Sequence, residues 1–370
     1  MTASADHEPT PQDQEDGHES GPQTKPVQKL AAARQGWKIA LRALVVVVLV
    51  LILSTVGVAL WVRSTLANNI DTFADPFASL ESRAPTQAAE DGQATATNIL
   101  LLGSDSREVA ADPSQWEAGA QRADAIMIVQ VSGDRQNVAV MSLPRDSWVE
   151  IPGYGQNKLN AAYSLGGPSL MVSAVEQLTA IHIDHVVIAD FSSFTQLTDD
   201  LGGVTINLAT EQELAGTTFP AGAQRLNGAQ ALDYTRERMS LPDGDLDRVQ
   251  RQQAWLRAIL SEALSKDTLT DPVALYSFLD TVTSTLSVDE GFTMGVMQDL
   301  ALECRNVRAS DMAFMTAPTS GTDTSPDGQS IVVLDDAADA ALFEAFATDS
   351  VMEYLEANPG AVETLPATAQ

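Results

Sequence analysis

The sequence is poor in cysteine, which excludes a disulfide bond within the chain, and poor in positive charge, which argues against a nucleic-acid partner. Its one cysteine, Cys304, cannot form a disulfide bond within the chain. An exported form of the protein would therefore depend on core packing for its stability. The 370 residues include 21 Lys+Arg against 50 Asp+Glu, a formal net charge of −29. Most of such a surface would repel a nucleic acid, which argues against a nucleic-acid partner.

The usual signatures of catalytic sites are also missing. There is no G-x-S-x-G elbow, Walker P-loop, G-x-G-x-x-G or H-E-x-x-H motif. His182 and His185 flank the start of an expected strand, and we favour a structural role over a metal pair because no further ligand lies near them in the sequence. Cys304 falls in a helical stretch and is interpreted as a small core residue rather than a nucleophile.

One long hydrophobic run stands out near the N-terminus. Residues 1–38 begin with an acidic, polar segment that lacks the large apolar residues needed to fold, and we interpret them as a disordered cytoplasmic tail. Uncharged residues follow without a break from Ala43 to Val62, enough to cross about 30 Å of hydrocarbon as a helix. We therefore predict a transmembrane signal-anchor helix over residues 39–62.

A cleaved signal peptide is the alternative interpretation of this run. The long region before the run and the lack of a small-x-small site after it disfavour cleavage. Five positive residues precede the run, and Arg63 alone stands just after it. This bias predicts a single-pass protein of the cell membrane, with a cytoplasmic N-terminus and an extracytoplasmic remainder.

The remainder divides into a linker, a domain and a tail. Residues 63–97 are polar and Ala-rich and are expected to form an extracytoplasmic linker, and residues 351–370 a C-terminal tail. Between them, residues 98–350 alternate apolar runs with helical patterns, which predicts an α/β domain with a sheet covered by helices. The expected strands are Asn98–Gly103, Asp124–Val131, Asn137–Leu143, Asp184–Asp190, Gly203–Leu208, 312–318 and 330–334. The expected helices are Pro168–Ala180, Phe191–Leu201, Gly228–Thr235, Leu246–Ser265, Asp271–Leu286, Phe292–Glu303 and 335–347.

Arginine is concentrated in one stretch of this acidic domain. The stretch contains Arg236, Arg238, Arg248, Arg251 and Arg257. Surface ion pairs are one interpretation, and we assign Arg251 to it because Asp247 precedes it by four residues on the same helix. The spacings of the other arginines indicate a role beyond surface ion pairs.

Asp245, Arg248 and Gln252 share one helix face, and Arg236 and Arg238 share a face if their stretch is extended. The Pro-Gly turn in "SLPDG" would fold the helix back beside that stretch. Converging guanidinium groups indicate a phosphate ligand.

Two carboxylates complement these arginines at expected strand ends. Asp105 follows the strand in "NILLLG", and Asp124 begins the next long strand. Ligands of open α/β sheets bind at strand ends, and Mg²⁺ that bridges a pyrophosphate takes few protein oxygens. The two acids are therefore candidate ligands of Mg²⁺, with Mn²⁺ as the alternative ion. Further basic residues stand in loops or beside strand ends, at Arg107, Arg122, Arg145 and Lys158.

Taken together, five segments resemble the LytR-CpsA-Psr family of cell-wall glycopolymer ligases. They are "NILLLGSDSR", "RADAIMIVQV", "VMSLPRDSWVEIPGYGQNKLNAAYSLGG", "IDHVVIADFSSFTQLTDDLGGVTINL" and "LNGAQALDYTRERMSLPDGDLDRVQRQQ". The resemblance covers about Asn98 to Phe346. It implies an α-β-α sandwich with a central mixed sheet and a hydrophobic pocket for the polyprenyl tail of a pyrophosphate-linked glycan. Family members transfer the glycosyl phosphate to peptidoglycan and release polyprenyl phosphate.

The resemblance also implies roles for individual residues. Asp105 and Asp124 match the family's magnesium-binding acids, and Arg107 lies in the first motif. Positions that contact pyrophosphate are matched by Arg122, Arg145, Arg236, Arg238 and Arg248, and further polar active-site positions by Lys158, Asp245 and Gln252. Asp245 and Asp146 are the candidate bases for the acceptor hydroxyl. The stretch between Asp105 and Arg122 leaves room for a longer loop than usual, and no additional C-terminal domain is expected.

The sequence therefore predicts a Mg²⁺-dependent, membrane-anchored phosphotransferase. Its expected partners are a polyprenyl-pyrophosphate-linked glycan, peptidoglycan and the membrane. A non-catalytic, membrane-tethered sensor of lipid-linked glycans is one alternative, and hydrolysis of polyprenyl pyrophosphates is another or a side activity. A DNA-binding regulator is disfavoured by the predicted topology, by the negative charge and by the lack of a helix-turn-helix.

Overall fold

The computed structural model describes residues 69–87, 94–104, 122–214, 216–236, 245–263 and 272–365. All of them belong to the unit Arg63–Gln370. The expected cytoplasmic tail and anchor lie outside the described residues, as do Asp105, Arg107, Arg238 and the side chain of Asp245. In the part that is described, no helix has the length and apolar character needed to cross a membrane.

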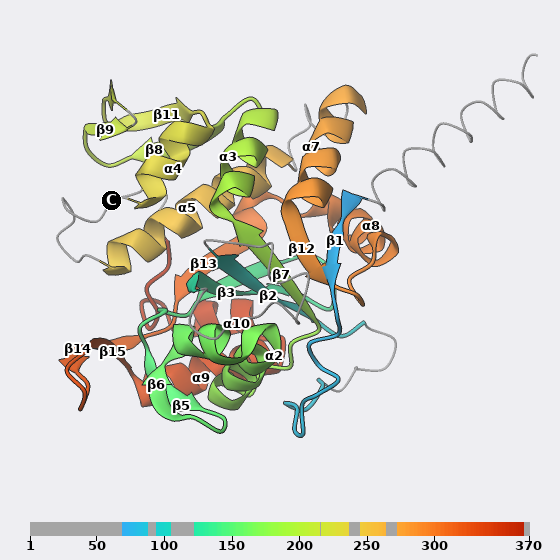
Figure 1. Cartoon of the computed structure of the whole chain (residues 1–370). Helices are drawn as coiled ribbons and strands as arrows, with labels where there is room; N and C mark the ends of the chain where they lie inside the picture. The colour runs from blue at the N-terminus through green and yellow to red at the C-terminus, as the bar shows by residue number, and fades with distance from the viewer. Residues whose placement is uncertain are drawn as a thin grey trace, which may run out of the picture. The chain divides into compact units, whose positions relative to one another are not determined.

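A seven-stranded mixed sheet forms the centre of this unit, in the order β1-β12-β7-β2-β3-β4-β13 (Figure 1). The strands are β1 (Asp71–Phe73), β2 (Thr97–Ser104), β3 (Ala123–Val131), β4 (Val138–Ser142), β7 (His185–Asp190), β12 (Leu286–Asp289) and β13 (Met312–Thr316). β2 runs parallel to β7 and antiparallel to β3, and β4 runs antiparallel to β3 and parallel to β13. The predicted α/β class with a central mixed sheet is confirmed.

Helices cover both faces of this sheet, as the two-sided apolar strands require. Successive strand residues point to opposite faces, so Leu100 and Leu102 pack into one core while Ile99 and Leu101 pack into others. One face carries α2 (Leu159–Thr179), α9 (Asp336–Ala347) and α10 (Val351–Ala357) (Figure 1). Helices on the other side are α3 (Phe191–Asp200), α4 (Gly228–Arg236), α5 (Asp245–Ala263), α7 (Pro272–Thr285) and α8 (Met294–Glu303).

Four two-stranded sheets surround the central one. They pair β5 (Trp148–Ile151) with β6 (Gly155–Lys158), β8 (Val204–Leu208) with β11 (Gly222–Leu226), β9 (Gln212–Leu214) with β10 (Thr217–Phe219), and β14 (Thr319–Thr324) with β15 (Ser330–Leu334). The expected strand Gly203–Leu208 therefore exists, but it pairs outside the central sheet. Its apolar residues Val204 and Ile206 belong to a separate core beneath α4 and α5.

The helix α2 begins earlier than predicted, at Leu159 rather than Pro168. Gly166 and Gly167 leave helical geometry, with Gly167 at φ 65°, so two helical segments join at a kink. Gly167 adopts this left-handed conformation because it has no Cβ. Pro168 opens the second segment, where its missing N–H costs no hydrogen bond.

The segment expected to be a linker is part of the fold over residues 69–87. β1 pairs in parallel with β12 at the edge of the central sheet, and Phe73 is only 3% exposed. Further along, Phe77 and Leu80 pack against the main core. The linker prediction is therefore wrong for these residues, because short apolar groups in a polar segment find partners that lie far away in the sequence.

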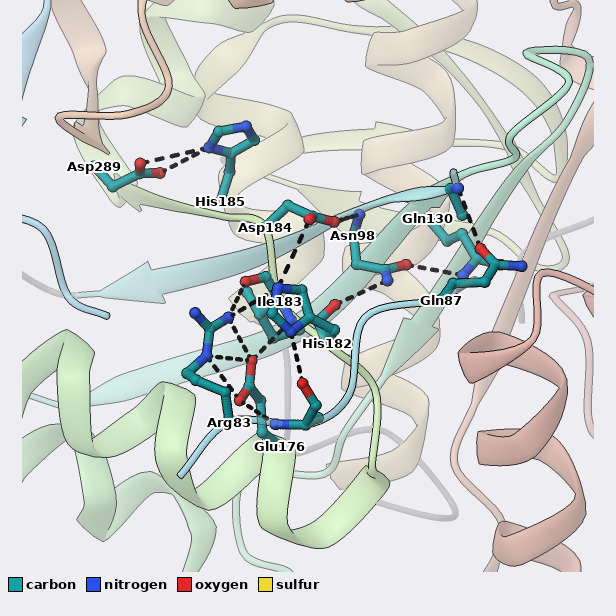
Figure 2. A network of polar contacts seen from close by, with 12 residues as sticks. Arg83, Gln87, Asn98, Gln130, Glu176, His182, Ile183, Asp184, His185 and Asp289 are labelled. Carbon is teal, nitrogen blue, oxygen red and sulfur yellow. Dashed lines mark hydrogen bonds and ion pairs between the residues drawn. The ribbon is translucent and has the colours of Figure 1, made fainter. Parts of the chain in front are cut away.

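Glu176 of α2 anchors the same segment (Figure 2). Glu176 is 5% exposed. Its carboxylate accepts hydrogen bonds from Nη2 of Arg83 at 2.7 Å and from the backbone N–H groups of Ala84 and Ile183 at 2.9 Å each. Nε of Arg83 donates as well, at 2.9 Å. A buried carboxylate with this many donors is fully compensated, so residues 83–84 are fixed to the end of α2.

His182 and His185 both have protein partners in the same region (Figure 2). Nδ1 of His182 lies 2.8 Å from the carbonyl oxygen of Ala84. His185 lies 3.3 Å from the carboxylate of Asp289 and stacks on Phe292 at 4.4 Å between ring centroids. These contacts support the structural interpretation of the two side chains.

The predicted C-terminal tail also belongs to the domain, as far as residue 365. α10 places Val351 in the main core, where it is 3% exposed, and Val362 is 6% exposed. The N–H of Leu365 donates to the carbonyl oxygen of Phe314 in β13 at 2.8 Å. The expectation of a separate tail was wrong here, since a few spaced apolar residues suffice to bury the segment.

Candidate functional site

The strands β2, β3 and β4 begin or end along one edge of the central sheet, an edge formed by strand ends rather than by an outer strand. β2 ends at Ser104, directly before Asp105, and β3 begins at Ala123 opposite Ser104. β4 ends at Ser142, and the N–H of Leu143 still donates to the carbonyl oxygen of Ile126 in β3 at 2.9 Å. The antiparallel pairing of β3 with both neighbours therefore brings its first residues beside the loop that follows β4.

Four predicted site residues form a row of alternating charge at this edge. The guanidinium of Arg145 makes an ion pair with Asp124 through Nη1, and its Nε lies 3.3 Å from one oxygen of Asp146. Nζ of Lys158 lies 2.9 Å from the other oxygen of Asp146. The four side chains are between 17% and 21% exposed. The row, called here the charge row, is shielded from bulk water but open to a ligand.

The helices α4 and α5 bring further predicted residues to the site. Arg236 is the last residue of α4 and is exposed. Arg248, in the first turns of α5, is 3% exposed, and Gln252 follows it one turn later on the same face. Arg122, exposed, stands directly before β3. The helical placement of Arg248 and Gln252 agrees with the sequence prediction.

An apolar cavity of about 40 Å³ lies between the sheet and these two helices. Gly103 and Ala125, which face each other in β2 and β3, form part of its lining. A Cβ on Gly103 would lie 3.0 Å from the Cβ of Ala125, so two small residues keep this space open. The remaining lining residues are Leu101, Met127, Ala231, Leu232, Thr235, Gln252, Trp255 and Leu256.

The cavity and the charged residues are contiguous along the chain. Ala125 directly follows Asp124 in β3, and Gln252 lies one turn beyond Arg248 in α5. Because Gly103 pairs with Ala125 and Ser104 with Ala123, Asp124 is the extra residue of a β-bulge next to the cavity lining, and the charge row begins at that residue. Apart from Gln252, the sequence prediction missed the cavity residues. The signal that could have found them is the pair of small residues, Gly103 and Ala125, in otherwise bulky apolar strands.

The two neighbours of Gln252 in the sequence, Arg251 and Gln253, are both buried. The sequence analysis did not single out Gln253, and it assigned Arg251 to a surface ion pair. Gln253 is 1% exposed, and its Nε2 donates to Oγ of Ser142 at 2.8 Å and to the carbonyl oxygen of Met315 at 2.6 Å, which ties α5 to β4 and β13. Arg251 is 3% exposed and donates to the carbonyl oxygen of Tyr234 at 3.2 Å. Its assignment to a surface pair was therefore wrong; the side chain of Asp247 lies outside the described residues.

One carboxylate of the charge row, Asp124, is of the type that holds a magnesium ion bridging phosphates. Within the described ranges no group of three or more His, Cys, Asp or Glu residues could hold a metal by itself. Mg²⁺ in such sites needs only one or two carboxylates and takes its other oxygens from phosphate and water. Asp124, at the start of β3, and Asp105, which directly follows β2, would supply those carboxylates from neighbouring strands.

Fold and site together define a class of protein: a helix-covered mixed sheet with an apolar cavity and a row of charged side chains at one edge. The LytR_cpsA_psr family model matches residues 65–346 of the chain. The chain therefore belongs to the LytR-CpsA-Psr family.

Two curated relatives come from Corynebacterium glutamicum. The chain is 33% identical over 287 residues to the cell wall biosynthesis protein LcpA, an alignment that covers 66% of this chain and 55% of the relative. It is 34% identical over 256 residues to the probable cell wall biosynthesis protein LcpB, covering 67% and 58%. The chain thus spans a little over half the length of these relatives.

Solved structures share the fold. TagT bound to LI-WTA superposes with a TM-score of 0.58 at 24% identity, over 74% of this chain and 98% of that chain. TagV of Bacillus subtilis gives a TM-score of 0.56 at 22% identity, over 72% and 99%. These similarities concern the arrangement of the helices and strands.

Proposed function

We propose that this chain is a phosphotransferase of cell-wall biosynthesis that moves a glycosyl phosphate from a polyprenyl-pyrophosphate-linked glycan to a hydroxyl of peptidoglycan. The observation that carries the proposal is the position of Asp124, a member of the charge row, at the β-bulge directly before Ala125, which lines the apolar cavity. A polyprenyl pyrophosphate has the matching form, an apolar chain that ends in a strongly anionic group. The names of the cell wall biosynthesis protein LcpA and the probable cell wall biosynthesis protein LcpB agree with this assignment.

The size of the cavity has a consequence for lipid binding. At about 40 Å³ it is far smaller than a site for a long isoprenoid chain, since ligand pockets typically measure ~300–1,000 Å³. Leu232 and Thr235 come from α4, and Trp255 and Leu256 come from α5. We propose that these two helices move apart from the sheet when the lipid enters, so that the cavity marks the start of the lipid site.

The main task in phosphoryl transfer is to neutralise charge on the phosphoryl oxygens and on the leaving group. Arg145 and Lys158, joined by Arg122, Arg236 and Arg248, provide cations for this around one edge of the sheet. Mg²⁺, when bound by Asp105 and Asp124, would neutralise further negative charge on the pyrophosphate. Arg107 and Arg238 remain proposed contributors.

The acceptor hydroxyl would attack the sugar-proximal phosphorus in line, and the bond from that phosphorus to the bridging oxygen would break and release polyprenyl phosphate. The hydroxyl must lose its proton in this step. Asp245 begins α5, where the positive end of the helix dipole favours a carboxylate, and it is our candidate base. Asp146 is the weaker candidate because each of its oxygens already faces a cation, Arg145 or Lys158. We propose that Asp146 orients these two cations toward the phosphate.

The proposed place of action is the outer side of the cell membrane. The apolar run within residues 39–62 and the positive residues before it support a single-pass anchor with a cytoplasmic N-terminus. An enzyme with this topology would meet both the membrane lipid carrier and peptidoglycan on the same side.

The test is a transfer assay with the full chain in vesicles, lipid-linked glycan, Mg²⁺ and peptidoglycan. Covalent attachment of the glycan is expected with the wild type, and Arg145→Ala should lower its rate by about 100-fold or more, as loss of a positioned charge stabiliser does. Arg135→Ala is the matched control, because Arg135 is paired with Glu303 at the opposite end of the sheet. Release of glycan phosphate without attachment would identify a hydrolase, and binding without either product would identify a sensor.

A further inference from the structure

Arg251 is a buried cation that sequence spacing assigned to the surface. It is 3% exposed, and its Nη1 donates to the carbonyl oxygen of Tyr234 at 3.2 Å. Its guanidinium carbon also lies 4.7 Å from the centre of the Tyr234 ring. Tyr234 is itself fully buried. One side chain of α5 therefore contacts both the backbone and the ring of a residue in α4.

The carbonyl group that Arg251 contacts lies in the last described turn of α4, Gly228–Arg236. Carbonyl groups in the last turn of a helix have no partner within the helix and form the negative end of its dipole. A guanidinium is well suited to this position, because it donates a hydrogen bond and carries the opposite charge. Arg251, which belongs to the neighbouring helix α5, therefore caps a carbonyl group of α4.

The ring contact is one of a cation with a neutral aromatic ring. Burial raises the pKa of Tyr234 to about 12, although the charges of Arg251 and Arg257 act in the opposite direction. The phenol stays protonated at any physiological pH, and a guanidinium over its face is attracted by the ring quadrupole. The Tyr234 hydroxyl has no hydrogen-bond partner among the residues described, so the ring and the backbone carbonyl carry the contact.

The neighbours of these two residues belong to the proposed site. Thr235 and Gln252, each next in sequence to a member of the contact, both line the apolar cavity. Arg236 follows Tyr234 by two residues at the end of α4, and Arg248 precedes Arg251 by three residues, about one helical turn. The contact thus joins the same turns of α4 and α5 that carry the cavity lining and the arginines proposed for pyrophosphate.

We propose that Arg251 is a positioning residue, which braces α4 against α5 through Tyr234 and so sets Arg236 and Arg248 relative to the lipid cavity. This inference rests on the proposed function. Arg251 itself touches no substrate. Its role is to keep the cavity and the pyrophosphate arginines at the separation that a polyprenyl pyrophosphate requires.

The test compares Arg251→Ala, Arg251→Lys and Tyr234→Phe with the wild-type full chain. Binding of farnesyl pyrophosphate and glycan transfer are measured well below each variant's melting temperature, and hydrogen exchange of α4 is measured without ligand. Arg251→Ala should speed exchange in the last turn of α4 and leave α2 unchanged. It should also lower the maximal transfer rate on the order of 100-fold, as misplacement of catalytic groups by about 1 Å does.

The conservative variants separate positioning from general stability. Arg251→Lys should recover part of the transfer rate because an ammonium can still donate to the Tyr234 carbonyl, and Tyr234→Phe should behave as the wild type. Arg225→Ala is the matched control: Arg225 pairs with Glu262 of the same helix α5 but is 45% exposed. It should leave binding, transfer and the exchange of α4 unchanged.

Several outcomes would overturn the proposal. One is normal exchange in α4 of Arg251→Ala, which would show that no brace exists. Another is a transfer rate that falls only in proportion to the unfolded fraction, or that Arg251→Lys does not improve. Faster exchange in Arg251→Ala, combined with a wild type that neither binds farnesyl pyrophosphate nor transfers glycan, would refute the proposed function and reduce the contact to a structural one.

Discussion

Asp339 is a buried carboxylic acid whose ionised form is destabilised, and replacing it should change how the stability of the protein depends on pH. The side chain lies in the first turn of α9 and is 3% exposed. Burial raises its pKa from 3.8 to about 7, with the negative charges of Asp335 and Asp336 adding to the effect. We choose Asp339→Asn because it keeps the shape and removes the titration.

The direction of this pH dependence follows from how many protons the folded and the unfolded states bind. Between about pH 4 and pH 7 the folded protein holds a proton on Asp339 that the unfolded chain has released. Stability is therefore greatest below the unfolded pKa, falls as the pH rises, and levels off above the folded pKa. The full difference corresponds to at most about 4 kcal/mol, and about 3 kcal/mol should be lost between pH 5 and pH 8.

The assay is urea unfolding of the full chain, followed by tryptophan fluorescence at pH 5, 6, 7 and 8. We expect the free energy of unfolding of Asp339→Asn to exceed that of the wild type by about 2 to 4 kcal/mol at pH 8, with the difference shrinking toward pH 5. Asp336→Asn, which removes one exposed neighbouring charge, should reduce the pH dependence only slightly. Parallel pH profiles for the wild type and Asp339→Asn would refute the reasoning.

Two other replacements test the cavity and the anchored N-terminal segment. Ala125→Leu should fill the cavity, cost about 1 to 3 kcal/mol of stability through overpacking, and weaken farnesyl pyrophosphate binding in a titration while inorganic pyrophosphate binds as before; equal losses for both ligands would count against a lipid site. Glu176→Ala should cost about 3 to 5 kcal/mol in urea unfolding because Arg83 is left partly buried without its partner. Glu303→Ala, which removes the exposed partner of Arg135, should cost less than about 1 kcal/mol, and similar losses for the two would contradict this account.

Much of the secondary structure was predictable because its signals are local. The runs "NILLLG" and "DAIMIVQV" became the paired strands β2 and β3, since continuous apolar residues suit strands buried on both faces. The spacing of Arg248 and Gln252 placed both on one face of α5, as observed. Periodicity decides these features within a few residues, so no knowledge of distant partners is needed.

The sequence predicted which residues belong to the site better than it predicted their contacts with one another. The sequence identified Asp124, Arg145, Asp146 and Lys158 as site residues, but it did not indicate that Arg145 pairs with both acids or that each oxygen of Asp146 faces a cation. Those contacts depend on the register of β3 against β4 and on the return of the chain through β6. Register is set by the pairing of whole strands, which no single motif contains.

The sequence by itself determined the fold class, the family, the main strands and helices, and the residue types that gather at the edge of the sheet. Tertiary structure alone decided that Arg83 binds Glu176, 93 residues away, and that residues 69–87 are therefore part of the domain. It also decided that Arg251 is buried against Tyr234 rather than exposed. Local patterns report the conformation of neighbouring residues, whereas burial and ion pairing depend on which distant residues the folded chain brings together.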